Sequence, residues 1–556
     1  MTHGRRRLAS LLALASFAGS ALGQSTWRAS IAPGGVQGTH DSFTGSDVSD
    51  DGTIVVFASW AKNWVAGDKP GTFDVFVRDT VNDTLDCISL STGGLPGTGD
   101  SLDPHISGDG RFVLFISDSP SLVAGDNNGW YDVFLFDRQT STTTRVDVDN
   151  NGNEANFGAA EPRFSADGRY ALFSTGSTNL DPGDTNNFND VYLRDLQLGT
   201  TERISIATSG VEGHKDSFSG GVSDDGNLVV FASYANNLDP ADANGGGDIF
   251  LRDRAAGTTT LISLDSNGNS ANGDCFYSTI SGDGRIVAFG SYASNLVAND
   301  TNHNDDVFVR DLATGETTCA SVDSNGALGL GVCSPATLTQ DGRYVVFASI
   351  ADLTPNPSIF VQPTVFLRDR TLGITLTPAE DSAGTPSKGE SSDPSASSDG
   401  RFISFWCSKN DLVSGDTNGR DDVFVHEFCV TPAAWANFGA GLAGTNGVPS
   451  LTATAPLLHS DGTVTIGDST GLGTFGVLFV GDNSGTVPTT LGADILLLPT
   501  SYVGLTLPAG GLTLVESIPE DEYLCGFTTS AQVLELDPGA VKGVSFTPRL
   551  DLTFGR

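Results

Sequence analysis

The run Pro-Arg-Phe-Ser-Ala-Asp-Gly-Arg-Tyr-Ala-Leu-Phe-Ser at residues 162–174 decides the fold of this chain. It places a turn motif, Ser/Thr-x-Asp-Gly, between two short runs that are rich in aromatic and β-branched residues. The same motif recurs along the chain with its Gly at positions 52, 110, 168, 226, 284, 342 and 400. Seven copies in one phase, 58 residues apart, indicate an internal repeat.

Each repeat predicts four short strands. In the third copy the first strand ends in the motif within 162–168, and the others are 169–174, 190–195 and 201–206, joined by turns and by one polar loop. Such a unit forms an antiparallel sheet that cannot bury both faces alone. Seven sheets packed around a ring can do so, and a ring leaves no open end. We therefore predict an all-β fold, a seven-bladed β-propeller at residues 24–430.

The two ends of the repeat array predict how the ring closes. The seventh copy supplies strands near 393–397, 402–408 and 422–428 and then stops without a fourth strand. Residues 26–32 resemble 201–207, which is a fourth strand. The first strand of the chain is therefore expected to complete the last blade.

The repeat resembles the WD40-like propeller repeat of TolB-type bacterial proteins, often called PD40, over about residues 25–430. The resemblance rests on Ser-x-Asp-Gly-Arg-aromatic followed by a strand close to Asp-Val-Phe-Leu-Arg-Asp. It implies a propeller but no single function, because this fold serves as binding platform, protease gate and lyase. The Pro usual in that family's Ser-Pro-Asp-Gly is replaced here by Asp50, Gly108, Ala166, Asp224, Gly282, Gln340 and Ser398.

The N-terminus and the charge predict an exported protein. Arg5, Arg6 and Arg7 precede an apolar run at 8–18, and small residues then lead to a cleavage site after Gly23, so residues 1–23 read as a signal peptide. No segment is long enough to span a bilayer. The net charge of -38 argues against a nucleic acid or an anionic membrane surface as partner. We expect a monomer in the periplasm, at the cell surface or outside the cell.

Acidic loops before the third strand are the candidate metal sites. Five repeats carry Asp-x-Asn-x-x-x-Asp there, a spacing that offers hard oxygen ligands to calcium. The residues are Asp126, Asn128, Asp132, Asp184, Asn186, Asp190, Asp242, Asn244, Asp248, Asp300, Asn302, Asp306, Asp416, Asn418 and Asp422. The alternative is a network of Asx turns that braces a long loop without metal. The first repeat keeps Asp68 and Asp74 around Pro70, and the sixth has Ser358, Phe360 and Thr364 instead.

The chain changes character after the repeats. Residues 431–436 are predicted to be a linker, and 437–556 contain about eight alternating runs that predict a β-sandwich. The segments 437–445 and 525–527 loosely resemble an uncharacterised C-terminal domain of secreted bacterial proteins, which implies no known activity. Surface retention, glycan contact or capping are the roles expected of such a domain.

The sequence favours a non-enzymatic binding platform for a protein or a glycan. Exposed Trp60, Trp64 and Trp130 could stack on a sugar or peptide, or pack against a neighbouring blade. A polysaccharide-active lyase or hydrolase and a structural envelope protein are the alternatives. No paired His motif occurs, and no catalytic residue and no cofactor other than calcium is predicted.

The chain contains seven cysteines, which raises the question of whether disulfides form. An exported chain permits disulfides, and the odd number leaves at least one thiol without an intramolecular partner. Cys275 and Cys333 occupy the same place in adjacent repeats, which makes a bridge between them conceivable if their Cα atoms approach within about 7 Å.

Overall fold

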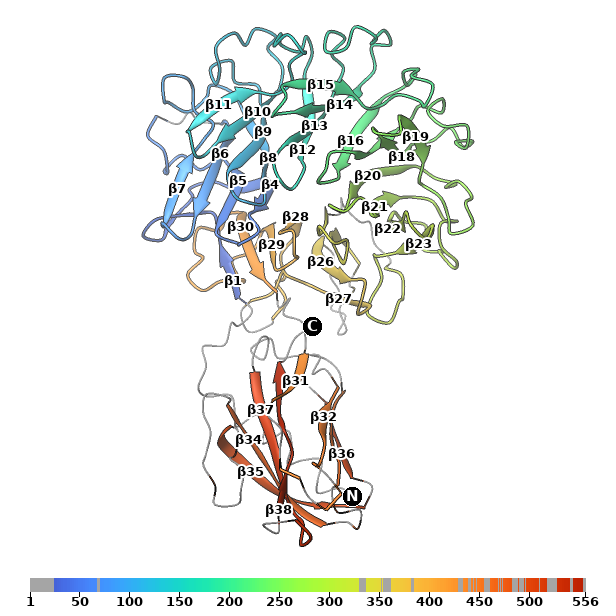
Figure 1. Cartoon of the computed structure of the whole chain (residues 1–556). Coiled ribbons are helices and arrows are strands. Elements are labelled where there is room, and N and C mark those ends of the chain that lie inside the picture. The colour runs from blue at the N-terminus through green and yellow to red at the C-terminus, as the bar shows by residue number, and fades with distance from the viewer. Residues whose placement is uncertain are drawn as a thin grey trace. The chain divides into compact units, whose positions relative to one another are not determined.

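The computed structural model describes most of the repeat region and part of the C-terminal region. The described residues are 25–67, 71–329, 337–351, 353, 362–381, 385–428, 434–438, 442–443, 445–446, 448–454, 461–468, 470, 472, 474–482, 489, 495, 497–509, 511–517, 528–540 and 544–553. The expected signal peptide at 1–23 lies outside them. The chain separates into two compact units, one of them Ser25–Glu427 and the other containing 428–556. The described elements are all strands (Figure 1).

The first unit contains seven four-stranded antiparallel sheets among its described residues. From first to fourth strand, three of them are β4 (Ser42–Val48), β5 (Ile54–Ser59), β6 (Asp74–Asp79) and β7 (Thr84–Cys87); β8 (Ser101–Ile106), β9 (Phe112–Ser117), β10 (Asp132–Asp137) and β11 (Thr142–Arg145); and β12 (Ala159–Phe164), β13 (Tyr170–Thr175), β14 (Asp190–Asp195) and β15 (Thr200–Arg203). The next three are β16 (Ser217–Val222), β17 (Leu228–Ser233), β18 (Asp248–Asp253) and β19 (Thr258–Leu261); β20 (Cys275–Ile280), β21 (Ile286–Ser291), β22 (Asp306–Asp311) and β23 (Glu316–Cys319); and β24 (Thr337–Leu338), β25 (Tyr344–Ser349), β26 (Thr364–Asp369) and β27 (Ile374–Leu376). The last is β28 (Ser391–Ala396), β29 (Phe402–Cys407), β30 (Asp422–Glu427) and β1 (Ser25–Arg28). A small ribbon of β2 (Ile31–Ala32) and β3 (Val36–Gln37) stands beside them.

The sheets are arranged around a common centre. The first strands contact one another in the order β4, β8, β12, β16, β20, β24, β28 and back to β4. Figure 1 shows these strands toward the centre and the fourth strands at the rim. Strand β1 pairs antiparallel with β30, with Arg28 opposite Phe424, and so takes the place of a fourth strand. This arrangement of sheets around a ring is a β-propeller.

The turn motif has a local structural role. Asp225 Oδ1 accepts hydrogen bonds from Ser223 Oγ at 2.7 Å and from the backbone N–H of Asn227 at 2.9 Å. Gly226 has a φ of +70°, and a Cβ at this position would lie 2.3 Å from the ring of Tyr170 in the preceding sheet. The Asp therefore braces the turn, while the Gly permits both its conformation and the close packing of neighbouring sheets.

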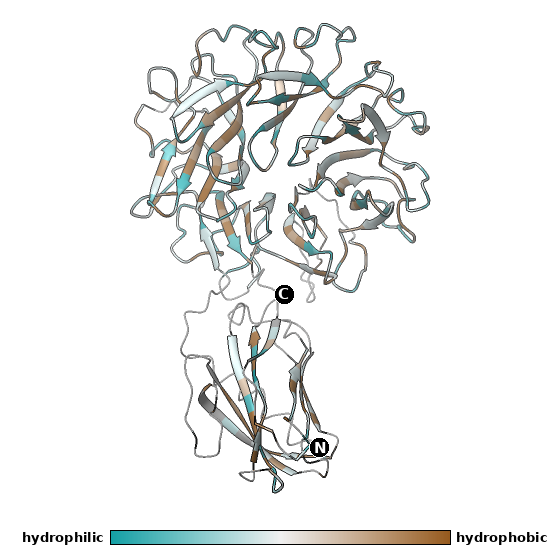
Figure 2. Cartoon of the chain, in the orientation of Figure 1, coloured by the Kyte–Doolittle hydropathy of each residue, from teal (hydrophilic) through white to brown (hydrophobic). Residues whose placement is uncertain are grey.

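The core lies between the sheets. All six residues of β5 are buried, so both faces of this strand are covered. Aromatic rings on second and third strands recur as pairs, such as Phe231 with Phe250 at a centroid distance of 5.7 Å. Figure 2 shows hydrophobic residues concentrated in these strands. The repeat therefore buries its apolar residues against the next copy of itself.

The second unit is also built of antiparallel strands. One sheet contains β31 (Ala434–Phe438), β39 (Arg549–Thr553), β37 (Thr528–Leu536), β34 (Thr474–Asp482) and β35 (Leu498–Leu507), with β38 (Val544–Phe546) beside β37; another contains β32 (Leu451–Ala453), β33 (Asp461–Ile466) and β36 (Leu512–Ser517). Leu451 and Ile466 share one core with Leu478 and Val533. Residues 434–436 were expected in the linker, but they belong to β31, because their backbone pairs with β39.

Candidate functional site

One end of every sheet carries the long loops. Ser59, at the end of β5, is paired with Ser42 at the start of β4 and with Asp74 at the start of β6. The same register recurs in the other sheets, so the acidic loops all leave the same end. We call this end, with its loops, the loop face; the Asp-Gly turns lie at the opposite end.

The asparagines of the five acidic loops act as braces. Each Asn Oδ1 accepts the backbone N–H two residues later, and each Nδ2 donates to a backbone carbonyl of a following loop. The backbone N–H groups that donate to Oδ1 belong to Trp130, Phe188, Gly246, Asn304 and Arg420. The carbonyls that accept from Nδ2 belong to Ala155, Gly213, Ala271, Gly329 and Gly38. These are Asx turns, in which the carboxamide oxygen is already used. The carboxylates are thus the remaining candidates for a cation.

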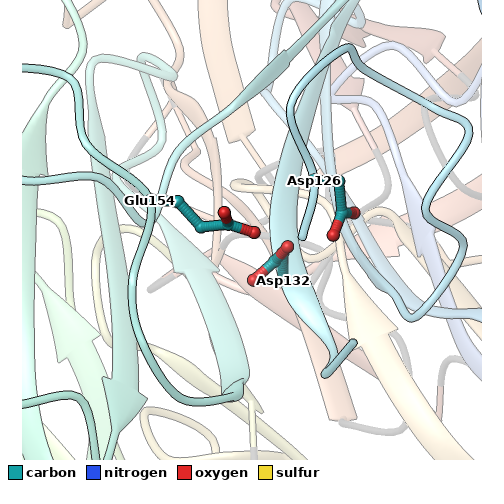
Figure 3. Close-up of side chains that lie close together, drawn as sticks. All are labelled: Asp126, Asp132 and Glu154. Carbon is teal, nitrogen blue, oxygen red and sulfur yellow. The ribbon is translucent and has the colours of Figure 1, made fainter. Parts of the chain in front are cut away.

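An arginine lies between the carboxylates in three of the five loops. Each arginine ends a fourth strand and has a side chain that is at most 8% exposed. Arg145 is 3.2 Å from Asp126, 3.3 Å from Asp132 and 2.9 Å from Glu154. Figure 3 shows how these three carboxylates converge. Because the guanidinium lies among them, an internal cation already offsets their charge.

The other two arginines make the same kind of contact. Arg203 lies 3.3 Å from Asp190, 3.7 Å from Asp184 and 3.0 Å from Glu212. Burial raises the pKa of Asp190 to about 6, although Arg203 and the Ser205 hydroxyl hold it down. In the last sheet, Arg28 of β1 lies 2.9 Å from Asp416 and 3.4 Å from Asp422. The N-terminal strand therefore supplies a charge partner as well as backbone pairing.

Two loops lack this arginine. Leu261 and Cys319 end the fourth strands of their sheets at the position of Arg203. Burial raises the pKa of Asp248 to about 7, and the charge of Asp242 adds to the rise. Burial also raises the pKa of Asp300 and Asp306.

The loops of the first and sixth repeats are only partly described. Asp74 is buried and its Oδ1 accepts a hydrogen bond from Ser89 at 2.5 Å, whereas Asp68 and Pro70 lie outside the described residues. Ser358, Phe360 and Cys333 lie outside them too, but Cys275 is described and has a free thiol, so the bridge that the sequence allowed is not formed. The Cys275 thiol donates to Ser291 Oγ at 3.2 Å.

A second group of polar residues, which the sequence analysis did not identify, lies on the first strands. Each of these strands that is fully described carries a register shift, and one repeat position within it holds Gly45, Asp103, Glu161, Ser219, Tyr277 and Asp393. Asp103, Glu161, Tyr277 and Asp393 adopt positive φ values between 46° and 54°. Non-glycine residues rarely do so, and such strain often accompanies a functional role. We call these four residues the bulge residues.

One bulge residue, Asp103, takes part in an ionic network that crosses the first strands. Arg163 Nη1 lies 2.7 Å from His105 Nε2, and His105 Nε2 lies 3.4 Å from Asp103 Oδ1. Burial opposes ionisation of Asp103, but His105 and Arg163 outweigh it and lower the pKa of this carboxyl. Asp393 Oδ2 accepts a hydrogen bond from Trp406 Nε1 at 3.1 Å. The network is confined to a few sheets, so it breaks the symmetry of the repeat.

Burial raises the pKa of the other two bulge carboxyls, Glu161 and Asp393. Nearby Asp103 contributes to the rise in both cases. The Asp103 side chain is nevertheless 35% exposed. Water therefore reaches the Asp103 carboxyl although protein atoms surround it. A partly buried, solvent-accessible carboxyl is typical of a group that contacts a ligand.

Aromatic side chains gather on the loop face. Trp60 packs against Phe73 at 4.4 Å and Trp64 against Phe76 at 5.2 Å, so both belong largely to the interior. Trp130 is 48% exposed. Other exposed aromatics at this end are Phe157, Phe188, Tyr234, Tyr277 and Tyr292. Of the three predicted tryptophans, Trp130 is thus the best placed to stack on a ligand.

The described part of the chain contains no helix with the length and hydropathy that a membrane crossing requires. No protein-family profile and no curated protein matches the chain.

Solved structures with some likeness are a TolB protein from Agrobacterium tumefaciens, a prolyl endopeptidase and the WD40 repeats of RRP9. Their identities are 15%, 11% and 10%, with TM-scores of 0.34, 0.41 and 0.38. They cover 53%, 89% and 73% of this chain, which spans 83%, 61% and 98% of theirs. At these values no activity follows from the likeness.

Proposed function

We propose that this chain is an exported binding platform: a seven-bladed propeller whose loop face takes a polysaccharide or protein ligand, followed by a β-sandwich domain. The observation that supports it is the strained, asymmetric set of bulge residues. Each strained residue costs about 1–3 kcal/mol, whereas Gly45 occupies the same repeat position without that cost. Residues that only hold the fold together recur in every sheet, so a ligand is the simplest reason to keep these.

The chemistry of the loop face favours a sugar-containing ligand. Trp130 and Phe157 lie 4.6 Å apart, and Tyr277 and Tyr292 both contact Phe276 at 5.2 Å. Exposed rings of this kind stack on the apolar faces of sugars, and carboxylates accept hydrogen bonds from their hydroxyls. A polar peptide is the other ligand that the same groups could take.

Affinity electrophoresis of the full chain tests this function. Native gels containing a neutral, an acidic or a cationic polysaccharide should retard the protein in at least one case. Tyr277→Ala should weaken that retardation, while Leu198→Ala, which removes an exposed side chain from the opposite end of a sheet, should not. Equal mobility in all gels would exclude a glycan and leave a protein partner or a structural envelope role.

A polysaccharide lyase or hydrolase is the second candidate function. It is favoured by Glu161 and Asp393, because a carboxyl whose pKa is raised by burial can act as a general acid or base. Incubation with any polysaccharide that binds, followed by assays for new reducing ends and for unsaturated products, tests it. Activity that is lost in Glu161→Gln, with binding retained, would replace the platform by an enzyme.

Export and processing complete the proposal. A signal peptide at residues 1–23 predicts that the mature protein begins at Gln24. N-terminal sequencing of the protein recovered from a bacterial host's periplasm or medium checks this.

A further inference from the structure

The acidic loop before the third strand recurs in several repeats with different residues around it, so the repeats can be compared with one another. Where the third strand begins with a buried Asp and an arginine ends the fourth strand, the guanidinium contacts the carboxylates. Arg145 and Arg203 also contact Glu154 and Glu212, which occupy the same repeat position. In the fourth repeat, Leu261 replaces the arginine and Ser270 replaces the glutamate. The carboxylates are kept and the positive charge is lost.

In this loop, one buried oxygen of each carboxylate has neither a hydrogen bond nor an arginine beside it. Asp248 is fully buried and Asp242 is 8% exposed, and the Oδ2 atom of each accepts no hydrogen bond. The Ser270 hydroxyl is buried and unpartnered as well. Among the residues that the structure describes, no arginine or lysine pairs with either carboxylate. Buried charges without a partner are strongly unfavourable.

We propose that the loop between β17 and β18 binds a divalent cation of the calcium type through Asp242 and Asp248, at the place where an arginine side chain lies in three other sheets. The Ser270 hydroxyl and water add the further hard oxygens that calcium prefers. Asn244 does not bind the ion, because its amide braces the loop. The proposal is independent of the loop-face ligand.

The fifth repeat serves as a comparison within the same chain. It also lacks the arginine, but both oxygens of Asp306 accept hydrogen bonds, from Ser321 at 2.6 Å and Asn302 at 2.7 Å. Its carboxylate at the start of the third strand therefore has the partners that Asp248 lacks. Buried oxygens without a hydrogen bond also occur on Asp126, Asp132, Asp184 and Asp416. Each of those carboxylates has an arginine within 3.7 Å, and the fourth repeat is distinguished by having neither partner.

Two substitutions of one residue give the sharpest test. Leu261→Arg installs the internal cation of the other repeats, whereas Leu261→Met has a similar stem without charge. Full-length protein stripped with chelator is titrated with calcium chloride in a calorimeter. We expect Leu261→Arg to bind one calcium fewer than the wild type and Leu261→Met to bind the same number. Asp242→Asn, which keeps the shape of the side chain, should also lose one calcium and decides the test if Leu261→Arg does not fold.

Thermal melts distinguish neutralisation of the two carboxylates by a metal ion from neutralisation by a proton. Calcium should raise the melting temperature of the wild type above that in chelator or in sodium chloride of equal ionic strength. The rise should shrink in Leu261→Arg. Because protons compete for Asp248, the rise should be larger at pH 8 than at pH 6; Lys215, Asp239 and Asp274 are the other charged groups that act on the pair.

Three results would overturn the proposal. One is the absence of calcium binding to the wild type. Another is a calcium stoichiometry that neither Leu261→Arg nor Asp242→Asn changes. The third is a chelated protein whose melting temperature rises from pH 8 to pH 6 while calcium adds nothing at either pH, since a proton would then neutralise the site.

Discussion

Replacing Arg203 by methionine tests whether the internal arginines neutralise the acidic loops. The substitution keeps much of the apolar stem and removes the guanidinium from Asp184 and Asp190, whose side chains are fully buried. Removing one partner of a buried ion pair leaves an uncompensated charge and costs about 3–5 kcal/mol. Glu212 is partly exposed and adds less. We therefore expect the free energy of unfolding to fall by about 3–5 kcal/mol.

Urea denaturation in chelator at pH 8 measures this change, with Arg169→Met as the control. Arg169 forms a single ion pair with Asp195 at 2.7 Å, in the same sheet, and is 32% exposed. Because the Arg169 side of this pair is open to solvent, the control should lose less than Arg203→Met, nearer the ~1 kcal/mol upper end for exposed pairs. A similar loss in both variants would show that burial of the charge is not what matters.

The stability cost of Arg203→Met should also depend on pH in a definite direction. The pKa of Asp190 is raised to about 6 in the folded protein, above its value in the unfolded chain, and loss of Arg203 should raise it further. The folded variant then takes up a proton more readily than the unfolded one, so its stability falls as the pH rises through the folded-state pKa. The cost of Arg203→Met should therefore be smaller at pH 5 than at pH 8. An equal cost at both pH values, or a cost below about 1 kcal/mol at pH 8, would refute the reasoning.

Three further predictions concern stability. Deleting β1 should destabilise the first unit by at least about 3 kcal/mol, because Asp422 loses its buried arginine as well as a paired strand; an unchanged melting temperature would contradict this. Asp147→Ser should stabilise the protein at pH 8 and do so less at pH 5, since burial and neighbouring acids raise the pKa of this carboxyl well above its ordinary value; paired melts at the two pH values check it. Gly226→Ala should cost about 1–3 kcal/mol more than Gly257→Ala in urea titrations, because both glycines have a φ of +70° but only the first would press a Cβ against Tyr170.

The repeated architecture could be predicted from the sequence because its determinants are local. A turn such as Ser223-Asp-Asp-Gly226 forms its hydrogen bonds within five residues, and the alternating runs beside it need only a neighbouring strand. Each of these signals recurs at the same spacing, so seven weak indications support one another. That is why the all-β fold with repeated four-stranded antiparallel sheets is confirmed by the structure.

The candidate sites depended on contacts that local patterns do not contain. The sequence placed Asp126 and Asp132 in an acidic loop, but only the packing of the fourth strand against that loop puts Arg145 between them. Likewise, Arg163 meets His105 from the neighbouring sheet, 58 residues away. Charge compensation acts through space and depends on distance and burial. The sequence by itself therefore determined the strands, their turns and their repetition, whereas the tertiary structure alone decided which buried charges have a partner and which do not.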